Sequence, residues 1–126
     1  MNGFSDPYYK IFVDDENLFT SEKIRKTLNP QWNGTFITSL KRSGEIQRVY
    51  TFRIEVWDWD KYSSDDFIGE VVMDIDLRRE RIFELEGQWY TLLRKGTKES
   101  GTIQMDIQFA IDDELVKNIK YKWVSF

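Results

Sequence analysis

The most regular feature of the sequence is the alternation of apolar and polar residues along two segments. In residues 49–57 and again in residues 101–111, apolar residues recur at every second position. A period of two is typical of a β-strand that buries one face. We therefore predict a strand in each segment. The core residues expected from these two strands are Phe52, Ile54, Val56, Ile103, Met105, Ile107 and Phe109.

Shorter segments add further strands. Aromatic and β-branched residues between turn signals predict strands at residues 8–13, 35–40, 67–75 and 88–93. Residues 21–28 fit either a charged edge strand or a short helix. Residues 77–85 fit a short helix or a loop. Six or more short strands favour an all-β fold built as an antiparallel β-sandwich.

The C-terminal tail has a pattern of its own. We expect one β-sandwich domain over residues 1–111, followed by a tail over residues 112–126. A short helical turn fits residues 112–118, and strand-like alternation of apolar residues begins at Ile119. The tail therefore includes a candidate for one added strand.

The composition excludes several kinds of chemistry. The chain of 126 residues has no cysteine and no histidine, so disulfides, thiolate metal sites and histidine general bases are excluded. We expect no enzymatic activity from a small domain that lacks these groups. Any metal site must use oxygen ligands, which suit a hard cation such as calcium or magnesium. The net charge of −4 argues against nucleic acid as a partner.

Signals for membrane insertion and export are not apparent in the sequence. No apolar run approaches the roughly 20 residues that a helix needs to cross a bilayer. The first ten residues lack the basic and apolar regions of a secretory signal. We expect a cytoplasmic location.

One loop concentrates negative charge. Residues 58–66 follow the clearest strand and hold four aspartates within nine positions. Ionised carboxylates this close repel one another, and a divalent cation relieves the repulsion. A solvated acidic loop without a ligand is the alternative. An EF-hand is excluded because its acid or amide, glycine and glutamate positions are taken by Tyr62, Ser63 and Gly69.

Several motifs, in a consistent order, resemble those of the C2 domain family. They are Asn2–Tyr8, Lys26–Phe36, Glu55–Asp60, Asp65–Glu70, Trp89–Leu92 and Gly101–Ile103. The second motif, with its Leu-Asn-Pro-Gln-Trp-Asn run, departs from the family at Gly34, where a glutamate is usual. The resemblance implies a C2-like, Greek-key β-sandwich.

The resemblance also implies calcium ligands in two loops of the family. The matching residues here are Asp6, Asp58, Asp60 and Asp66, with Ser63 as a weaker oxygen ligand. Asp65 matches a variable position and is not counted. The family has a first strand and a further ligand aspartate that would precede or coincide with Met1. The tail strand expected at residues 119–126 is a candidate for the vacated place.

Membrane-contacting positions follow from the same resemblance. The loop-tip residues that it implies are Phe4, Trp59, Lys61 and Tyr62. Packing at the sandwich edge is the alternative for Trp59. A basic strand that contacts phosphoinositide headgroups in some members is matched by Lys23, Arg25 and Lys26. A solvated edge is the alternative for this strand.

These features favour a calcium-dependent, membrane-targeting module that binds anionic phospholipids as a peripheral membrane protein. Calcium would neutralise the aspartates, and the loop tips would meet the headgroup region. Two alternatives keep a β-sandwich. One is a calcium-independent module that binds a protein partner, and the other is a module that binds carbohydrate through exposed aromatic residues.

Overall fold

The computed structural model describes residues 6–25, 30–32, 35–38, 49–80, 82–110 and 117–125. These residues form eight strands and no helix. The strands are β1 (Pro7–Val13), β2 (Glu16–Thr20), β3 (Thr35–Thr38), β4 (Val49–Asp58), β5 (Asp66–Asp76), β6 (Ile82–Arg94), β7 (Lys98–Ala110) and β8 (Lys117–Ser125). Neighbouring strands are antiparallel throughout.

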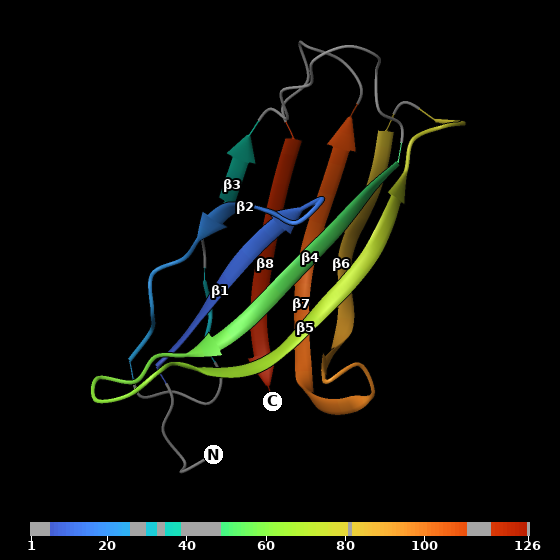
Figure 1. Cartoon of the computed structure of the whole chain (residues 1–126). Helices are drawn as coiled ribbons and strands as arrows, with labels where there is room; N and C mark the ends of the chain where they lie inside the picture. The colour runs from blue at the N-terminus through green and yellow to red at the C-terminus, as the bar shows by residue number, and fades with distance from the viewer. Residues whose placement is uncertain are drawn as a thin grey trace.

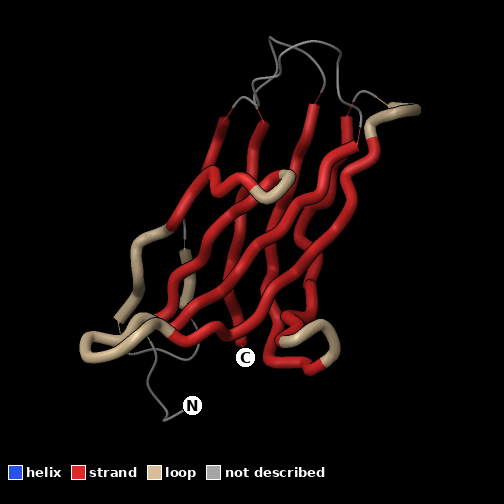
Figure 2. The backbone as a smooth tube through the Cα atoms, in the orientation of Figure 1, coloured by secondary structure: helices blue, strands red, loops and turns tan. Residues whose placement is uncertain are grey.

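The strands lie in the order β2-β1-β4-β5-β6-β7-β8-β3. This sheet folds back on itself between β5 and β6, which are joined by the single pair Glu70 and Leu93. One layer is β2-β1-β4-β5 and the other is β6-β7-β8-β3, and Figures 1 and 2 show the second layer behind the first. Strand β3 belongs to the second layer, whereas β2 and β4, which precede and follow it in the chain, belong to the first. The predicted antiparallel Greek-key β-sandwich is confirmed.

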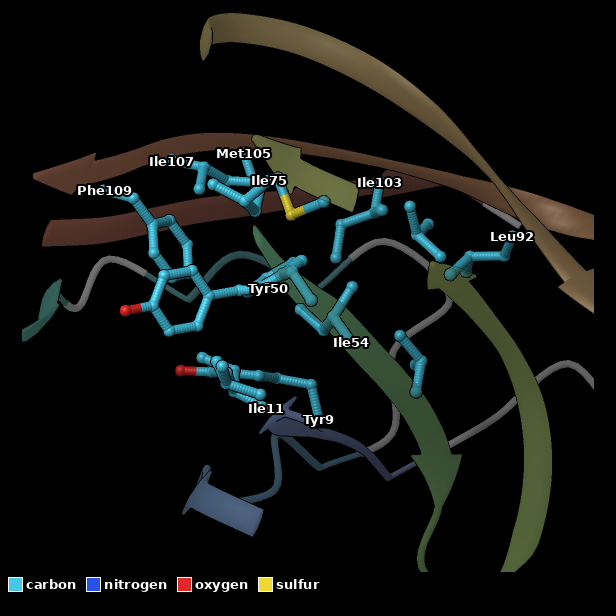
Figure 3. Packing of buried hydrophobic residues seen from close by; sticks show 14 of the residues in the cluster. Tyr9, Ile11, Tyr50, Ile54, Ile75, Leu92, Ile103, Met105, Ile107 and Phe109 are labelled. Carbon is cyan, nitrogen blue, oxygen red and sulfur yellow. The ribbon is translucent and has the colours of Figure 1, made fainter. Parts of the chain in front are cut away.

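Alternation along β1, β4 and β7 builds the core between the layers. All seven core residues predicted from the sequence are buried, with at most 1% of their surface exposed. Figure 3 shows Ile54 of β4 in one cluster with Ile103 and Phe109 of β7. The ring centroids of Phe52 and Phe109 lie 6.2 Å apart across the layers. Because burying each large apolar side chain contributes about 1.5–3 kcal/mol, this core fixes which face of each strand points inward.

The helix considered for residues 77–85 is wrong in the described part of that segment. Strand β6 begins at Ile82, and residues 77–80 form no helix. In the ladder with β7, Ile82 stands opposite Ala110, and Phe83 packs half-buried against the core. This long-range pairing outweighs the local helix preference of the leucine, arginine and glutamate residues.

The edge strand or helix predicted at residues 21–28 is also wrong where the structure describes it. The strand at this edge is β2, which returns from β1 through a tight turn at residues 14–15. Residues 21–25 then follow β1 without regular structure. The Ser21 amide donates to the Tyr9 carbonyl at 2.9 Å, whereas the Tyr9 amide donates to the Ser21 hydroxyl at 2.9 Å. A side chain here replaces a backbone partner. The last three residues of the predicted segment lie outside the described ranges.

The C-terminal tail contributes a strand to the second layer. Strand β8 pairs with β7 on one side and with β3 on the other. Ile119 stands opposite Ile107, so the apolar positions of the tail are in register with the buried face of β7. The helical turn considered at residues 112–118 is wrong at its last two residues, which begin β8, and residues 112–116 lie outside the described ranges. A domain boundary after residue 111 stays a prediction.

Candidate functional site

Three strand ends meet where β4 turns into β5. We call residues 58–66 the acidic loop. In the sheet register, Asp58 stands opposite Pro7 of β1 on one side and opposite Asp66 of β5 on the other. Figure 1 shows this loop beside the start of β1. Because adjacent strands lie about 4.8 Å apart, Asp6, Asp58 and Asp66 reach the same end of the sandwich.

Hydrogen bonds tie the residue before β1 to the acidic loop. The Asp6 amide donates to Asp58 Oδ1 at 2.9 Å. The Trp59 amide donates to the Asp6 carbonyl at 3.1 Å. Two predicted calcium ligands, 52 residues apart in the chain, are therefore in direct contact.

Asp58 experiences the negative charge of its neighbours. Burial raises the pKa of the Asp58 carboxyl above its ordinary value, and the hydrogen bond from the Asp6 amide opposes the rise. The charges of Asp6, Asp66 and Asp60 raise the pKa of Asp58 further. All three predicted aspartate partners are thus close enough to act on Asp58. A cation placed among them would relieve this repulsion.

Asp60 holds the tip of the acidic loop. Its Oδ1 accepts a hydrogen bond from the Tyr62 amide at 2.9 Å, and its Oδ2 accepts one from the Ser63 hydroxyl at 2.7 Å. These bonds lower the pKa of Asp60 below its ordinary value. The predicted ligands Asp60 and Ser63 therefore contact each other.

Asp65 and Tyr8 form a contact that sequence reasoning missed. The Tyr8 hydroxyl donates to Asp65 Oδ2 at 2.5 Å, and the Asp60 amide donates to Asp65 Oδ1 at 3.0 Å. Burial, and then the hydrogen bond and charge of Asp65, raise the pKa of the Tyr8 phenol. No local sequence signal marks this pair, because it depends on the register of β1 with β4, which places Tyr8 opposite Trp57, immediately before the acidic loop.

The predicted loop-tip residues differ in exposure. Tyr62 is 88% exposed, and Lys61 is also exposed, with its ammonium 5.5 Å from the centroid of the Tyr62 ring. Trp59 is half-buried, and the ammonium of Lys23 lies 3.1 Å from the centroid of its ring. This cation–π contact connects the predicted basic segment to the acidic loop. Phe4 lies outside the described residues.

The remaining basic residues of that segment are placed only in part. Arg25 is exposed in a turn, and Lys26 lies outside the described residues. Lys23 is half-buried because it packs on Trp59. The described part of the basic segment therefore lies next to the acidic loop.

The oxygen chemistry of the site fits calcium, although the described acidic side chains do not form a complete set of metal ligands. Carboxylate and hydroxyl oxygens are ligands that calcium prefers. Among the described residues, no group of three or more acidic side chains is arranged to hold a metal ion together. The contacts that are present join Asp6 to Asp58 and Asp60 to Ser63, with Asp66 opposite Asp58 in the register.

Comparison with known proteins identifies the class of this β-sandwich. The profile of the C2 domain family matches residues 1–92. The chain belongs to the C2 domain family. It is 37% identical over 107 residues to mouse synaptotagmin-3, an alignment that covers 79% of this chain and 17% of that protein.

Two further relatives are large human proteins. The chain is 32% identical over 127 aligned positions to Ras GTPase-activating protein 4, covering 95% of this chain and 15% of that protein. It is 32% identical over 104 residues to piccolo, covering 72% of this chain and 2% of that protein. The chain thus spans less than a fifth of the length of each of these relatives. The part of the chain that the structure describes contains no helix long and apolar enough to span a membrane.

Proposed function

We propose that this C2 domain is a calcium-dependent module that binds anionic phospholipid membranes through the acidic loop and the residues next to it. The observation that carries the proposal is the position of Asp58. Its carboxylate contacts the Asp6 amide, and burial and then the charges of Asp6, Asp66 and Asp60 raise its pKa. Carboxylates that repel one another at one end of a sandwich form a site that a divalent cation stabilises.

The residues that would hold calcium are Asp6, Asp58, Asp60 and Asp66, with Ser63 as a weaker ligand. When bound, calcium supplies positive charge and coordination positions for phosphate or carboxylate oxygens of lipids. The bond from the Asp6 amide holds Asp58 Oδ1 beside the residue that precedes β1. Asp60 would exchange its bonds to the loop tip for the cation, because both of its oxygens accept hydrogen bonds in the structure.

The charge pattern around the loop supports a switch between repulsion and attraction. The aspartates repel an anionic leaflet, whose surface potential is about −30 mV. The basic residues Lys23, Arg25 and Lys26 each favour such a surface by about 1 kcal/mol when they lie near it. Neutralising the aspartates therefore leaves a net attraction. The exposed ring of Tyr62, with Lys61 beside it, suits the headgroup boundary. The proposed location is the cytoplasmic surface of a membrane.

A calcium-independent module that binds a protein partner is the second candidate. One observation favours it: within the described ranges, no three acidic side chains form a metal-binding group. In that case Asp60 and Asp65 would serve only to shape the loop through their hydrogen bonds. The two candidates differ in whether chelation of calcium changes binding.

Sedimentation with phosphatidylserine vesicles separates the candidates. The wild type is expected to pellet with vesicles in calcium and to stay in the supernatant in chelator. The variant Asp58→Asn/Asp60→Asn is expected to stay in the supernatant in both conditions. The matched control is Asp14→Asn/Asp15→Asn, which removes the same charge from the turn at the other end of β1 and should behave as the wild type. Wild-type protein that never pellets, or that pellets equally in chelator, would contradict the proposal.

A further inference from the structure

Asp65 differs from the other aspartates of the acidic loop in how its oxygens are used. Its Oδ2 accepts the hydrogen bond from the Tyr8 hydroxyl at 2.5 Å, and its Oδ1 accepts the bond from the Asp60 amide at 3.0 Å. Each carboxylate oxygen thus has a protein donor on a different part of the site. One donor belongs to β1 and the other to the loop itself.

Tyr8 is a rigid anchor for this contact. Its backbone lies in β1, opposite Trp57 of β4, immediately before the loop begins. A tyrosine side chain has few rotatable bonds, so its hydroxyl is held in place at little entropic cost. The contact joins residues 57 positions apart in the chain. It fastens the C-terminal part of the loop to the sheet.

The acidic loop is therefore held at both of its ends and across its middle. Its first residue, Asp58, is bonded to the Asp6 amide. Its later part is bonded through Asp65 to Tyr8, and Asp65 also holds the Asp60 amide. These bonds restrict the positions of Asp58, Asp60 and Asp66, and none of them involves Asp58 Oδ2.

We propose that Tyr8 and Asp65 are positioning residues, which hold the acidic loop in the conformation that receives calcium without binding the ion themselves. This inference rests on the proposed function, because it concerns the same site. A loop that is ordered before binding loses less conformational entropy when the ion arrives. Removing the brace should therefore weaken calcium binding more than it weakens the fold.

The first test is calcium titration, without lipid, of Tyr8→Phe, which removes only the hydroxyl. Calcium affinity is expected to fall about fivefold, because a hydrogen bond to a charged group is lost at a partly buried site. The melting temperature in chelator should change by less than about 2 °C, since the ring stays in β1. The matched control is Tyr90→Phe on β6, whose hydroxyl has no hydrogen-bond partner among the described residues. That control should keep the wild-type affinity.

The second test distinguishes a positioning residue from a ligand. Asp65→Asn keeps an oxygen for the Asp60 amide and an amide group for the Tyr8 oxygen, so it should retain most of the affinity. Asp65→Ala should lose affinity as Tyr8→Phe does, or more. Asp66→Asn removes a proposed ligand charge and serves as the reference for a damaged site. Affinity that falls as far in Asp65→Asn as in Asp66→Asn would overturn the inference and make Asp65 a ligand.

The outcomes for the two proposals are distinct. Wild-type protein that binds calcium, with Tyr8→Phe binding equally well, overturns the positioning role alone. The positioning role is also overturned if the loss of calcium affinity in Tyr8→Phe comes with a large fall of the melting temperature in chelator, because the variant is then simply less well folded. Wild-type protein that binds no calcium in this titration overturns the proposed function and the positioning role together.

Discussion

Gly69 on β5, three residues after the acidic loop, lies close to Leu92 of β6 and Ser100 of β7 in the other layer. A Cβ added at this position would lie 2.4 Å from Ser100 Oγ and 3.0 Å from Leu92 Cβ. The first clash can be relieved because the serine hydroxyl can rotate away. The second is harder to relieve because Leu92 is fully buried and protein interiors are tightly packed. The next residue, Glu70, makes the pair that joins β5 to β6.

The size of the effect of Gly69→Ala follows from these contacts. Forcing one extra methyl into a packed core costs about 1–3 kcal/mol. The hydrogen bond from the Ser100 hydroxyl to the Leu92 carbonyl, 3.3 Å long, is lost as well. We expect the free energy of unfolding to fall by about 2 kcal/mol. For a chain of this length that fall lowers the melting temperature by about 6–10 °C.

Thermal and urea unfolding, followed by circular dichroism in chelator, measure this effect. The variant Gly69→Ala/Ser100→Ala also lacks the serine hydroxyl, and it should be about as unstable as Gly69→Ala because the hydrogen bond is already lost there and the contact with Leu92 remains. Gly87→Ala is the control for conformation, since a Cβ there has no atom within 4 Å but the backbone φ is 62°. That control should cost about 1 kcal/mol through the left-handed backbone alone. A melting temperature of Gly69→Ala within about 2 °C of the wild type would refute the packing argument.

Three further predictions concern the tail, the basic segment and pH. Deletion of residues 112–126 should abolish cooperative unfolding measured by circular dichroism, because β8 separates β7 from β3; an unchanged unfolding transition would contradict this. A double-mutant cycle of Lys23→Met and Trp59→Leu should give a coupling free energy of about 0.5–1 kcal/mol from the cation–π contact, and a value near zero would remove that contact from the argument. The pKa of Asp58 is raised in the folded state, so the folded protein holds this proton more tightly than the unfolded chain does. The stability gained from protonated Asp58 is therefore fully present at low pH and is lost as the pH rises through the raised pKa. In chelator, Asp58→Asn should therefore be more stable than the wild type at pH 7. Urea titrations should show this difference in stability shrinking as the pH falls toward 3.8, the ordinary pKa of aspartate. A difference that does not change with pH would argue against a charge effect.

Alternation along the chain predicted the strands that build the core. Phe52, Ile54 and Ile103 are buried as their period of two indicates, because a one-residue shift would expose them all. The segment at residues 77–85 could not be assigned in this way. Its local composition favours a helix, and the pairing of Ile82 with Ala110 on β7 decides for a strand.

The candidate site was predictable in its residue types and not in its contacts. The four aspartates of the acidic loop are visible as a cluster in the sequence. Their approach to Asp6 depends on the register of β1 with β4, which no local pattern specifies. For the same reason the bond between Tyr8 and Asp65 and the contact of Lys23 with Trp59 were not predicted. Both join segments that are distant in the chain.

The most direct test of calcium-dependent membrane binding is a calorimetric calcium titration of the wild type, performed with and without phosphatidylserine vesicles. If lipid oxygens complete the coordination of the ion, binding of calcium and binding of the membrane must strengthen each other by the same factor. We predict a measurable calcium affinity without vesicles and an affinity at least tenfold tighter with them, which corresponds to about 1.4 kcal/mol or more of coupling. No calcium binding in either titration, or an affinity that vesicles leave unchanged, would contradict the proposed function.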